Sequence, residues 1–245
     1  MLADGQIDSP RYKELLMREE KNTQCLIKHL ENGVNFESFS GIFIDEGVTI
    51  QPGATILPGT FLRGKTSIGE NSTIGPGCVL ENVQIGADTE VKTSHLYGCV
   101  VENNVKIGPF VHIRPGSHIK SGVKIGDFVE VKNSTIGEGT SIAHLTYIGD
   151  SDVGRHCNFG CGVVTVNYDG EKKMRTQIAD YVFVGCNANL ISPVSIGEGA
   201  YIAAGSTVTK DVPPGALGIA RARQENKRGW AEKKLAAYRA KHEKE

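Results

Sequence analysis

An apolar residue, usually isoleucine, valine or leucine, returns at every sixth position along most of this chain. Neither an amphipathic helix nor an alternating strand has a period of six, whereas a solenoid of short strands does. The pattern therefore predicts an all-β solenoid. The periodic residues are Ile44, Ile50, Ile56, Leu62, Ile68, Ile74 and Leu80, then, after some five-residue steps, Ile107, Ile113, Ile119, Ile125 and Val131, and finally Ile178, Val184, Leu190, Ile196, Ile202 and Val208.

Each hexad is long enough for one short strand and one corner, so three hexads should form a triangular coil of about eighteen residues. The periodic residue and the often small residue two positions before it should point inward, and the residue between them outward. Successive coils lie about 4.8 Å apart, so residues one coil apart become stacked neighbours.

Three segments follow from the extent of the pattern. We expect an N-terminal helical arm or linker over 1–41, the solenoid over 42–212 with a polar loop insert at 166–177, and a basic C-terminal arm over 213–245. The first arm should contain a helix near 8–33, capped by Asp8 or Ser9. The residues of this helix that we expect to face inward are Leu15, Leu16, Cys25, Leu26 and Leu30.

Composition excludes several classes of partner. The formal net charge is −1, which argues against nucleic acid. There is no signal-peptide pattern, and no apolar run approaches the roughly 20 residues of a membrane helix, so we expect no membrane contact. The 6 cysteines occur singly, without a C-x-x-C pair, which is typical of a cytoplasmic protein. The 7 histidines show no zinc-type spacing, and we predict no metal site.

Two cations should be stacked neighbours. Arg114 and Lys132 each follow an inward residue and lie one coil apart. They repel each other unless an anion lies between them, and a phosphate suits the fork of an arginine. Alternatively, both side chains extend into solvent, or Glu130 of the adjacent outward column neutralises them. That column also contains His112 and Tyr147.

A second column contains the residues two positions after an inward residue: Asp127, His144, Cys161, Cys186 and Ala204. An imidazole can accept a proton from an amine or hydroxyl at neutral pH. The small residues above it would leave a groove where a thin ligand reaches unpaired backbone groups. We interpret the two cysteines as packing residues rather than as a thiolate nucleophile or a disulfide pair. We expect this column to lie near the basic corner and the loop insert.

Three stretches, 112–154, 158–170 and 199–230, resemble the acetyltransferase domain of the bifunctional glucosamine-1-phosphate N-acetyltransferase / N-acetylglucosamine-1-phosphate uridyltransferase family. The strings AHLTYIGD and NYDG carry this match, which covers about residues 42–230. The resemblance implies a left-handed parallel β-helix, assembled as a homotrimer with active sites at subunit contacts. It implies a cytoplasmic enzyme that acetylates the amine of glucosamine-1-phosphate from acetyl-CoA, toward UDP-N-acetylglucosamine and peptidoglycan.

The resemblance also assigns residues. His144 would be the base and Glu130 its orienting partner, although the column count places Asp127 below His144. The sugar phosphate would be bound by Arg114, Lys132, Tyr147, Asn158 and Lys173. Acetyl-CoA would contact Cys161, Asn167, Tyr168, Cys186, Ala204, Arg221 and Lys227, and the acetyl transfer would require no metal.

This chain departs from the family in two respects. The family usually has alanine in place of Cys161 and serine in place of Cys186, and a thiol donates more weakly than a hydroxyl near a thioester oxygen. The uridyltransferase half is expected to be missing, so uridylyl transfer is not predicted.

Other functions remain open. An acetyltransferase of the same fold would act on another amino sugar or a nucleotide-linked sugar. A γ-carbonic-anhydrase-like metal hydratase shares the solenoid, but the histidines here (His95, His112, His118 and His144) differ in their repeat positions. A non-catalytic trimeric scaffold would have no need of His144, Lys132 and Arg114 together.

Overall fold

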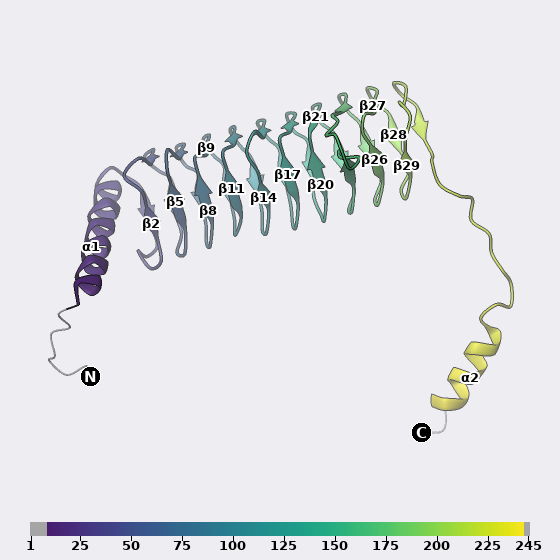
Figure 1. The fold of residues 1–245 in the computed structure, drawn as a ribbon, viewed down its shortest axis with the longest axis horizontal. Coiled ribbons are helices and arrows are strands. Elements are labelled where there is room, and N and C mark those ends of the chain that lie inside the picture. Colours follow the sequence, from purple (N-terminus) through teal and green to yellow (C-terminus); the bar gives the residue numbers. More distant parts are fainter. Residues whose placement is uncertain (1–8, 243–245) are drawn as a thin grey trace.

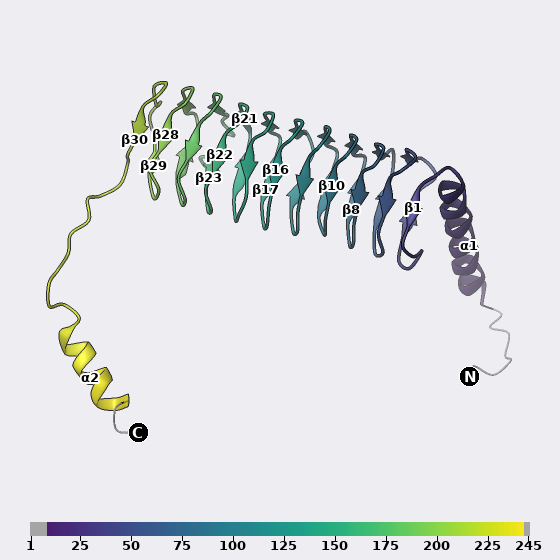
Figure 2. The same cartoon turned by 180° about the vertical axis from the view of Figure 1, so that it is seen from behind.

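A parallel β-solenoid dominates the molecule, as the hexad pattern predicts (Figure 1). The structure, a computed structural model, describes residues 9–242. Helix α1 (Pro10–Glu31) precedes the first coil and helix α2 (Glu232–His242) ends the described chain. Seen from behind, the chain leaves the last coil as an extended segment, and α2 stands apart from the coils (Figure 2).

The coils stack three parallel sheets of 11, 10 and 9 strands, here named sheets A, B and C. Sheet A contains β1 (Asn35–Phe36), β4 (Thr55–Ile56), β7 (Thr73–Ile74), β10 (Glu90–Val91), β13 (Lys106–Ile107), β16 (Lys124–Ile125), β19 (Ser141–Ile142), β22 (Asn158–Phe159), β25 (Phe183–Val184), β28 (Tyr201–Ile202) and β30 (Leu217–Gly218). Sheet B contains β2 (Phe43–Ile44), β5 (Phe61–Arg63), β8 (Val79–Glu81), β11 (His95–Tyr97), β14 (His112–Ile113), β17 (Glu130–Lys132), β20 (Tyr147–Gly149), β23 (Val164–Val166), β26 (Asn189–Ile191) and β29 (Thr207–Val208). Sheet C contains β3 (Thr49–Ile50), β6 (Ser67–Ile68), β9 (Gln84–Ile85), β12 (Val100–Val101), β15 (His118–Ile119), β18 (Thr135–Ile136), β21 (Ser151–Val153), β24 (Thr176–Ile178) and β27 (Ser195–Ile196). The paired strands reach further at both ends than the expected 42–212.

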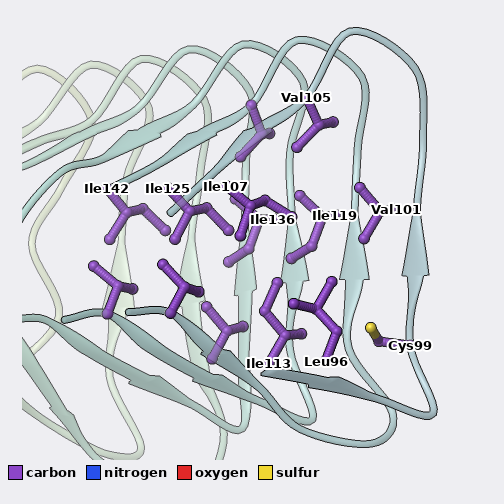
Figure 3. Close-up of a cluster of buried hydrophobic side chains, with 14 of the residues drawn as sticks. Leu96, Cys99, Val101, Val105, Ile107, Ile113, Ile119, Ile125, Ile136 and Ile142 are labelled. Carbon is purple, nitrogen blue, oxygen red and sulfur yellow. The ribbon is translucent and has the colours of Figure 1, made fainter. Parts of the chain in front are cut away.

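The interior is a continuous file of stacked aliphatic side chains. Ile107, Ile125 and Ile142 lie one above another because their strands pair in register (Figure 3). Both inward positions of a hexad are buried, as expected: Ala54 and Ile56, two residues apart, are fully buried. Each buried aliphatic side chain contributes about 1.5–3 kcal/mol through removal of its surface from water.

Helix α1 packs less of its surface than the sequence suggests. Leu26 is buried and Cys25 half-buried, but Leu15, Leu16 and Leu30 are about half exposed, so the prediction that they face inward is wrong. The helix contacts the solenoid at β2, and only the side facing that coil can be buried. Ser9 is at the N-cap without a side-chain hydrogen bond, and Asp8 lies outside the described residues.

The loop insert lengthens a single coil. Ile136 pairs with Val153, seventeen residues later, whereas Val153 pairs with Ile178, twenty-five residues later. The additional residues leave at the corner between sheets B and C. Tyr168 and Lys173 form an antiparallel bridge across them, so the insert is a short hairpin.

A polar cluster stabilises the face of sheet C. Glu102, just after β12, accepts hydrogen bonds from His118 Nε2 (2.8 Å), from Ser121 N (3.1 Å) and from Ser121 Oγ (3.0 Å), and lies 3.0 Å from Lys120 Nζ. Burial opposes ionisation of this carboxyl, but the hydrogen bonds from Lys120, Ser121 and His118 outweigh it and lower the pKa of Glu102 from 4.5 to about 2.

We expect this cluster to make stability depend on pH. Because the folded pKa is depressed, the stabilisation is complete above the ordinary pKa of 4.5 and is lost as pH falls toward 2. The side chain is about one-third exposed, so Glu102→Gln should cost only about 1 kcal/mol at pH 7. Urea unfolding at equal protein concentration should show this difference shrinking below pH 4. A Glu138→Gln control, which removes no ion pair of residues 9–242, should have the stability of the wild type at every pH. If the stability difference between Glu102→Gln and the wild type is unchanged at pH 2.5, Glu102 is not the group responsible.

Candidate active site

The first group of candidate residues lies at the corner between sheets B and C. Arg114, Lys132 and Tyr147 all point outward from sheet B, in stacked coils whose register places His112, Glu130 and Tyr147 in one column. The Tyr147 ring lies across Gly149, where a side chain at position 149 would collide with it. We call Arg114, Lys132, Tyr147 and the adjoining hairpin 167–175 the loop edge.

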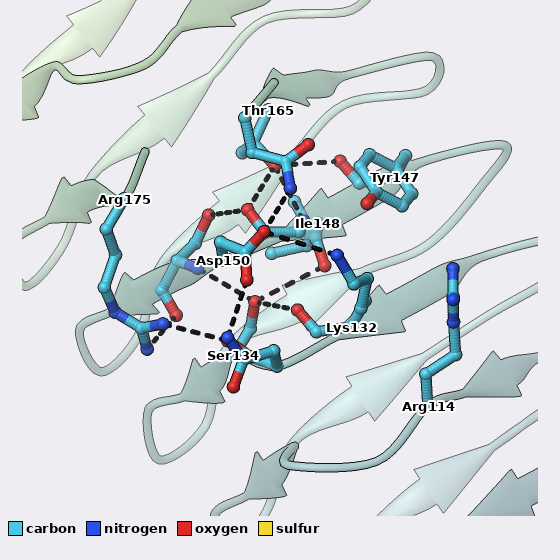
Figure 4. Close-up of polar contacts among 12 residues, drawn as sticks. Arg114, Lys132, Ser134, Tyr147, Ile148, Asp150, Thr165 and Arg175 are labelled. Atoms are coloured by element: carbon cyan, nitrogen blue, oxygen red, sulfur yellow. Dashed lines mark hydrogen bonds and ion pairs between the residues drawn. The ribbon is translucent and has the colours of Figure 1, made fainter. Parts of the chain in front are cut away.

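Two of the loop-edge cations have carboxylate partners. Arg114 donates from Nη1 to Glu130 Oε1 at 3.1 Å, which is the neutralisation that the sequence left open. Lys132 Nζ lies 3.4 Å from Asp150 Oδ2, and both of these side chains are largely buried. Figure 4 shows Asp150 among these contacts, between Lys132 and Arg175, with Arg114 on a neighbouring coil. Sequence reasoning missed Asp150, although it belongs to the AHLTYIGD string.

The hairpin brings a third cation to this edge. The neighbouring ammonium of Lys132 lowers the pKa of Lys173, and Arg114 lowers it further. Neighbouring positive charges lower the pKa of a lysine because they disfavour its charged form, unless an anion lies between them. Arg114, Lys132 and Lys173 together therefore carry one more positive charge than Glu130 and Asp150 neutralise.

The hairpin is fixed at both of its ends. Asn167 is buried and donates its side-chain amide to Asp150, and Met174 N donates to Asn167 O at 2.8 Å. At the other end, Arg175 contacts the Asp152 carboxylate from Nε (2.7 Å) and from Nη2. Tyr168 is exposed beyond this anchored base. Neither Asp152 nor Arg175 was singled out from the sequence, because an ion pair across 23 residues leaves no local pattern.

The second group lies at the corner between sheets A and B, and we call it the ladder edge. Ile125, Ile142, Phe159, Val184 and Ile202 pair in register on sheet A, which places Asp127, His144, Cys161, Cys186 and Ala204 in one column two residues later. In each coil the next residue has a left-handed backbone, which turns the column outward; these residues are Phe128, Leu145, Gly162, Asn187 and Gly205.

The ladder edge exposes unused backbone donors. Within residues 9–242, the main-chain N–H groups of Cys161, Cys186 and Ala204 make no hydrogen bond. Both cysteines are free thiols, Cys161 half-buried and Cys186 exposed. Arg221 passes close to Gly205 at the upper end of the column, and Lys227 is exposed further along the arm. A linear ligand carrying carbonyl oxygens would find donors along this column.

His144 has a different partner from the expected one. Its Nδ1 lies 4.0 Å from Asp127 Oδ2, and its side chain is 60% exposed. Among the described residues, Glu130 contacts Arg114 rather than His144, because Glu130 projects from the face of sheet B while His144 occupies a corner. The expected pairing of Glu130 with His144 is therefore not made within one chain.

The two edges do not meet within one chain. Lys132 is the partner of Gly149, at the end of β20, whereas His144 precedes the start of that strand, five residues earlier; five residues reach at most about 16 Å. Asn158 lies on sheet A, beyond the ladder edge. The expectation that the imidazole adjoins the basic corner and the loop is therefore wrong for a single chain. Among residues 9–242, no three potential ligand side chains are grouped as for a metal.

The repeat places the chain in a class of proteins. The family model described as "Bacterial transferase hexapeptide (six repeats)" matches residues 47–82, 98–133 and 175–210. Together with the coils described above, this match identifies a solenoid of hexapeptide repeats. Neither helix of the described chain is long and apolar enough to cross a membrane.

Similarity extends well beyond the repeat. Over 222 residues the chain is 54% identical to the "Bifunctional protein GlmU" of Caldanaerobacter subterraneus subsp. tengcongensis, covering 91% of this chain and 48% of the relative. The GlmU protein of Thermoanaerobacter pseudethanolicus is 51% identical over 222 residues, with the same coverage. The chain is therefore similar to part of these GlmU proteins, and it spans about half the length of the curated relatives it matches. A solved UDP-N-acetylglucosamine acyltransferase from Francisella novicida is 22% identical over 76% of this chain and 66% of that chain, with a TM-score of 0.42.

Proposed function

We propose that this chain transfers an acetyl group from acetyl-CoA to the amine of glucosamine-1-phosphate, producing N-acetylglucosamine-1-phosphate. The observation that carries the proposal is the loop edge, where Arg114, Lys132 and Lys173 converge and the cations lower the pKa of Lys173. A phosphate dianion on these three side chains would relieve their repulsion. Tyr147 and Asn158 would contact the sugar.

We further propose that the active site forms between copies of the chain in a homotrimer. On glucosamine-1-phosphate the amine and the phosphate are on neighbouring ring carbons, so base and phosphate site must lie within one sugar's reach. Within one chain His144 and Lys132 lie at opposite ends of the strands of sheet B, which favours a site built from different copies. The ladder edge of one copy against the loop edge of the next would supply both groups, and a closed threefold ring would provide three such sites.

Acetyl-CoA fits the ladder edge. The free N–H groups of Cys161, Cys186 and Ala204 suit a chain of amide carbonyls, and one of them would hold the thioester oxygen as it gains charge. Arg221 and Lys227 would meet the phosphates of CoA. Asn167 and Tyr168 of the loop edge would approach the same ligand from the adjacent copy.

The reaction needs one base and no covalent intermediate on the protein. The sugar amine attacks the thioester carbon, a C–N bond forms, and His144 takes the proton that the amine loses. The C–S bond breaks, and the thiolate of CoA leaves and takes up a proton. Asp127 rather than Glu130 would stabilise the imidazolium of His144. We place the reaction in the cytoplasm, where the 6 free cysteines remain reduced.

Release of CoA thiol from acetyl-CoA, measured with different acceptors, tests this function. Glucosamine-1-phosphate should be acetylated, and glucosamine without phosphate should have a kcat/KM at least about 100-fold lower, because the loop-edge cations would lose the phosphate that they hold. A UDP-linked amino sugar should also be slower. Faster acetylation of the nucleotide sugar would assign the alternative acceptor, and no thiol release with any amino sugar would overturn the proposal.

A further inference from the structure

Asp150 occupies an unusual place in the loop edge. It lies in the turn between β20 and β21, where its side chain is 9% exposed and its backbone is left-handed. A carboxylate so far withdrawn from water persists only where several donors satisfy it. Its partners therefore indicate what it is for.

The carboxylate joins three successive coils. Asp150 Oδ1 accepts from Asn133 Nδ2 at 2.6 Å in the coil below. Oδ2 lies near Lys132 Nζ and also accepts the side-chain amide of Asn167 in the hairpin above. The main chain repeats these ties, because Asp150 N donates to Lys132 O at 2.9 Å and Thr176 N donates to Asp150 O at 3.1 Å.

One oxygen atom thus holds two residues with different assigned ligands. Lys132 belongs to the proposed phosphate site, and Asn167 to the proposed acetyl-CoA site. Asn167 also fixes the hairpin through its bond from Met174, and that hairpin carries Lys173 back to Lys132. When Lys132 moves toward a bound phosphate, the charge near Asp150 and the position of its carboxylate change, and so does the hydrogen bond to Asn167. A movement of Asn167 toward bound acetyl-CoA changes the contact of Asp150 with Lys132 in the same way.

We propose that Asp150 is a positioning residue that couples the binding of the acceptor to the binding of acetyl-CoA. The proposal rests on the proposed function for the identity of the two ligands. Each ligand, once bound, fixes the Lys132–Asp150–Asn167 chain in the arrangement that the other requires, so the second ligand loses less freedom on binding. Coupling is reciprocal: each ligand should raise the affinity for the other by the same factor, about fivefold or more.

Isothermal titration of the full chain tests this without turnover. CoA is titrated with and without saturating glucosamine-1-phosphate, and glucosamine-1-phosphate with and without CoA. The wild type should show equal mutual enhancement. Asp150→Asn retains the size of the side chain but presents an amide where both donors meet, so the enhancement should vanish, with weaker affinity for each ligand alone.

The control is Asp180→Asn. Asp180 is another ion-paired carboxylate, which accepts a hydrogen bond from Arg155 Nε at 2.8 Å, and it belongs to neither edge. This variant should retain the full enhancement. If Asp150→Asn does not form wild-type trimers, Asn167→Ala replaces it: enhancement should be lost while glucosamine-1-phosphate alone still binds. Enhancement that survives in the folded variants, or is absent from a wild type that binds both ligands, overturns the inference and leaves the function standing. A wild type that binds neither ligand overturns both.

Discussion

Replacing His144 by alanine should lower kcat for acetyl transfer by about 10²–10⁴-fold while the affinities for both substrates change little. That is the range in which a positioned general base contributes to a proton transfer. His144 is exposed and belongs to a corner outside the core, so its loss should leave folding and assembly intact. The measurement is CoA thiol release under saturating substrates, with the oligomeric state checked by light scattering.

His156→Ala is the matched control for this variant. His156 is another exposed histidine, stacked on Tyr181 with ring centroids 5.6 Å apart, and it belongs to neither edge. It should keep wild-type turnover. Normal acetyl transfer by intact His144→Ala trimers would remove His144 from the mechanism.

Combining two inactive variants in one trimer should restore activity. Lys132→Met removes the ammonium from the loop edge, and the loss of a buried, paired charge of this kind costs about 2–5 kcal/mol of binding. The variant His144→Ala damages only the ladder edge. If each site takes His144 from one copy and Lys132 from the next, every mixed trimer contains one site at which both residues are intact. One active site of three should give about one third of wild-type activity.

Co-expression with two different tags, followed by purification on both, isolates the mixed rings. The control combines Lys132→Met with Arg114→Met. Both changes lie on the loop edge, so every site in a mixed trimer has an impaired phosphate site and activity should stay at background. Mixed rings of the His144 and Lys132 variants that also stay at background would show that the two residues do not meet across copies.

How much of this was predictable from the sequence differs between the solenoid and the site. The hexad period specified the coil, the inward positions and the stacking of Arg114 on Lys132, because strand pairing transmits a fixed register from one coil to the next. It also specified the column from Asp127 through His144 to Cys161. It did not specify which side of α1 is buried, since the amphipathic pattern of Leu15, Leu16 and Leu30 contains no information about what is available to cover them.

The residue contacts of the site required three dimensions. Glu130 contacts Arg114 because its side chain projects from the flat face of sheet B. Asp127 lies below His144 because both residues occupy the same corner of successive coils. The role of Asp150 emerged only from the tertiary structure, in which the hairpin of the lengthened coil folds back and brings Asn167 to its carboxylate.

By itself the sequence determined a stacked solenoid, its register and the chemical types in each column, because those depend on a local period repeated through hydrogen-bonded strands. Only the tertiary structure decided that the imidazole and the cations occupy opposite edges of one sheet, because distance across a face depends on where the corners fall.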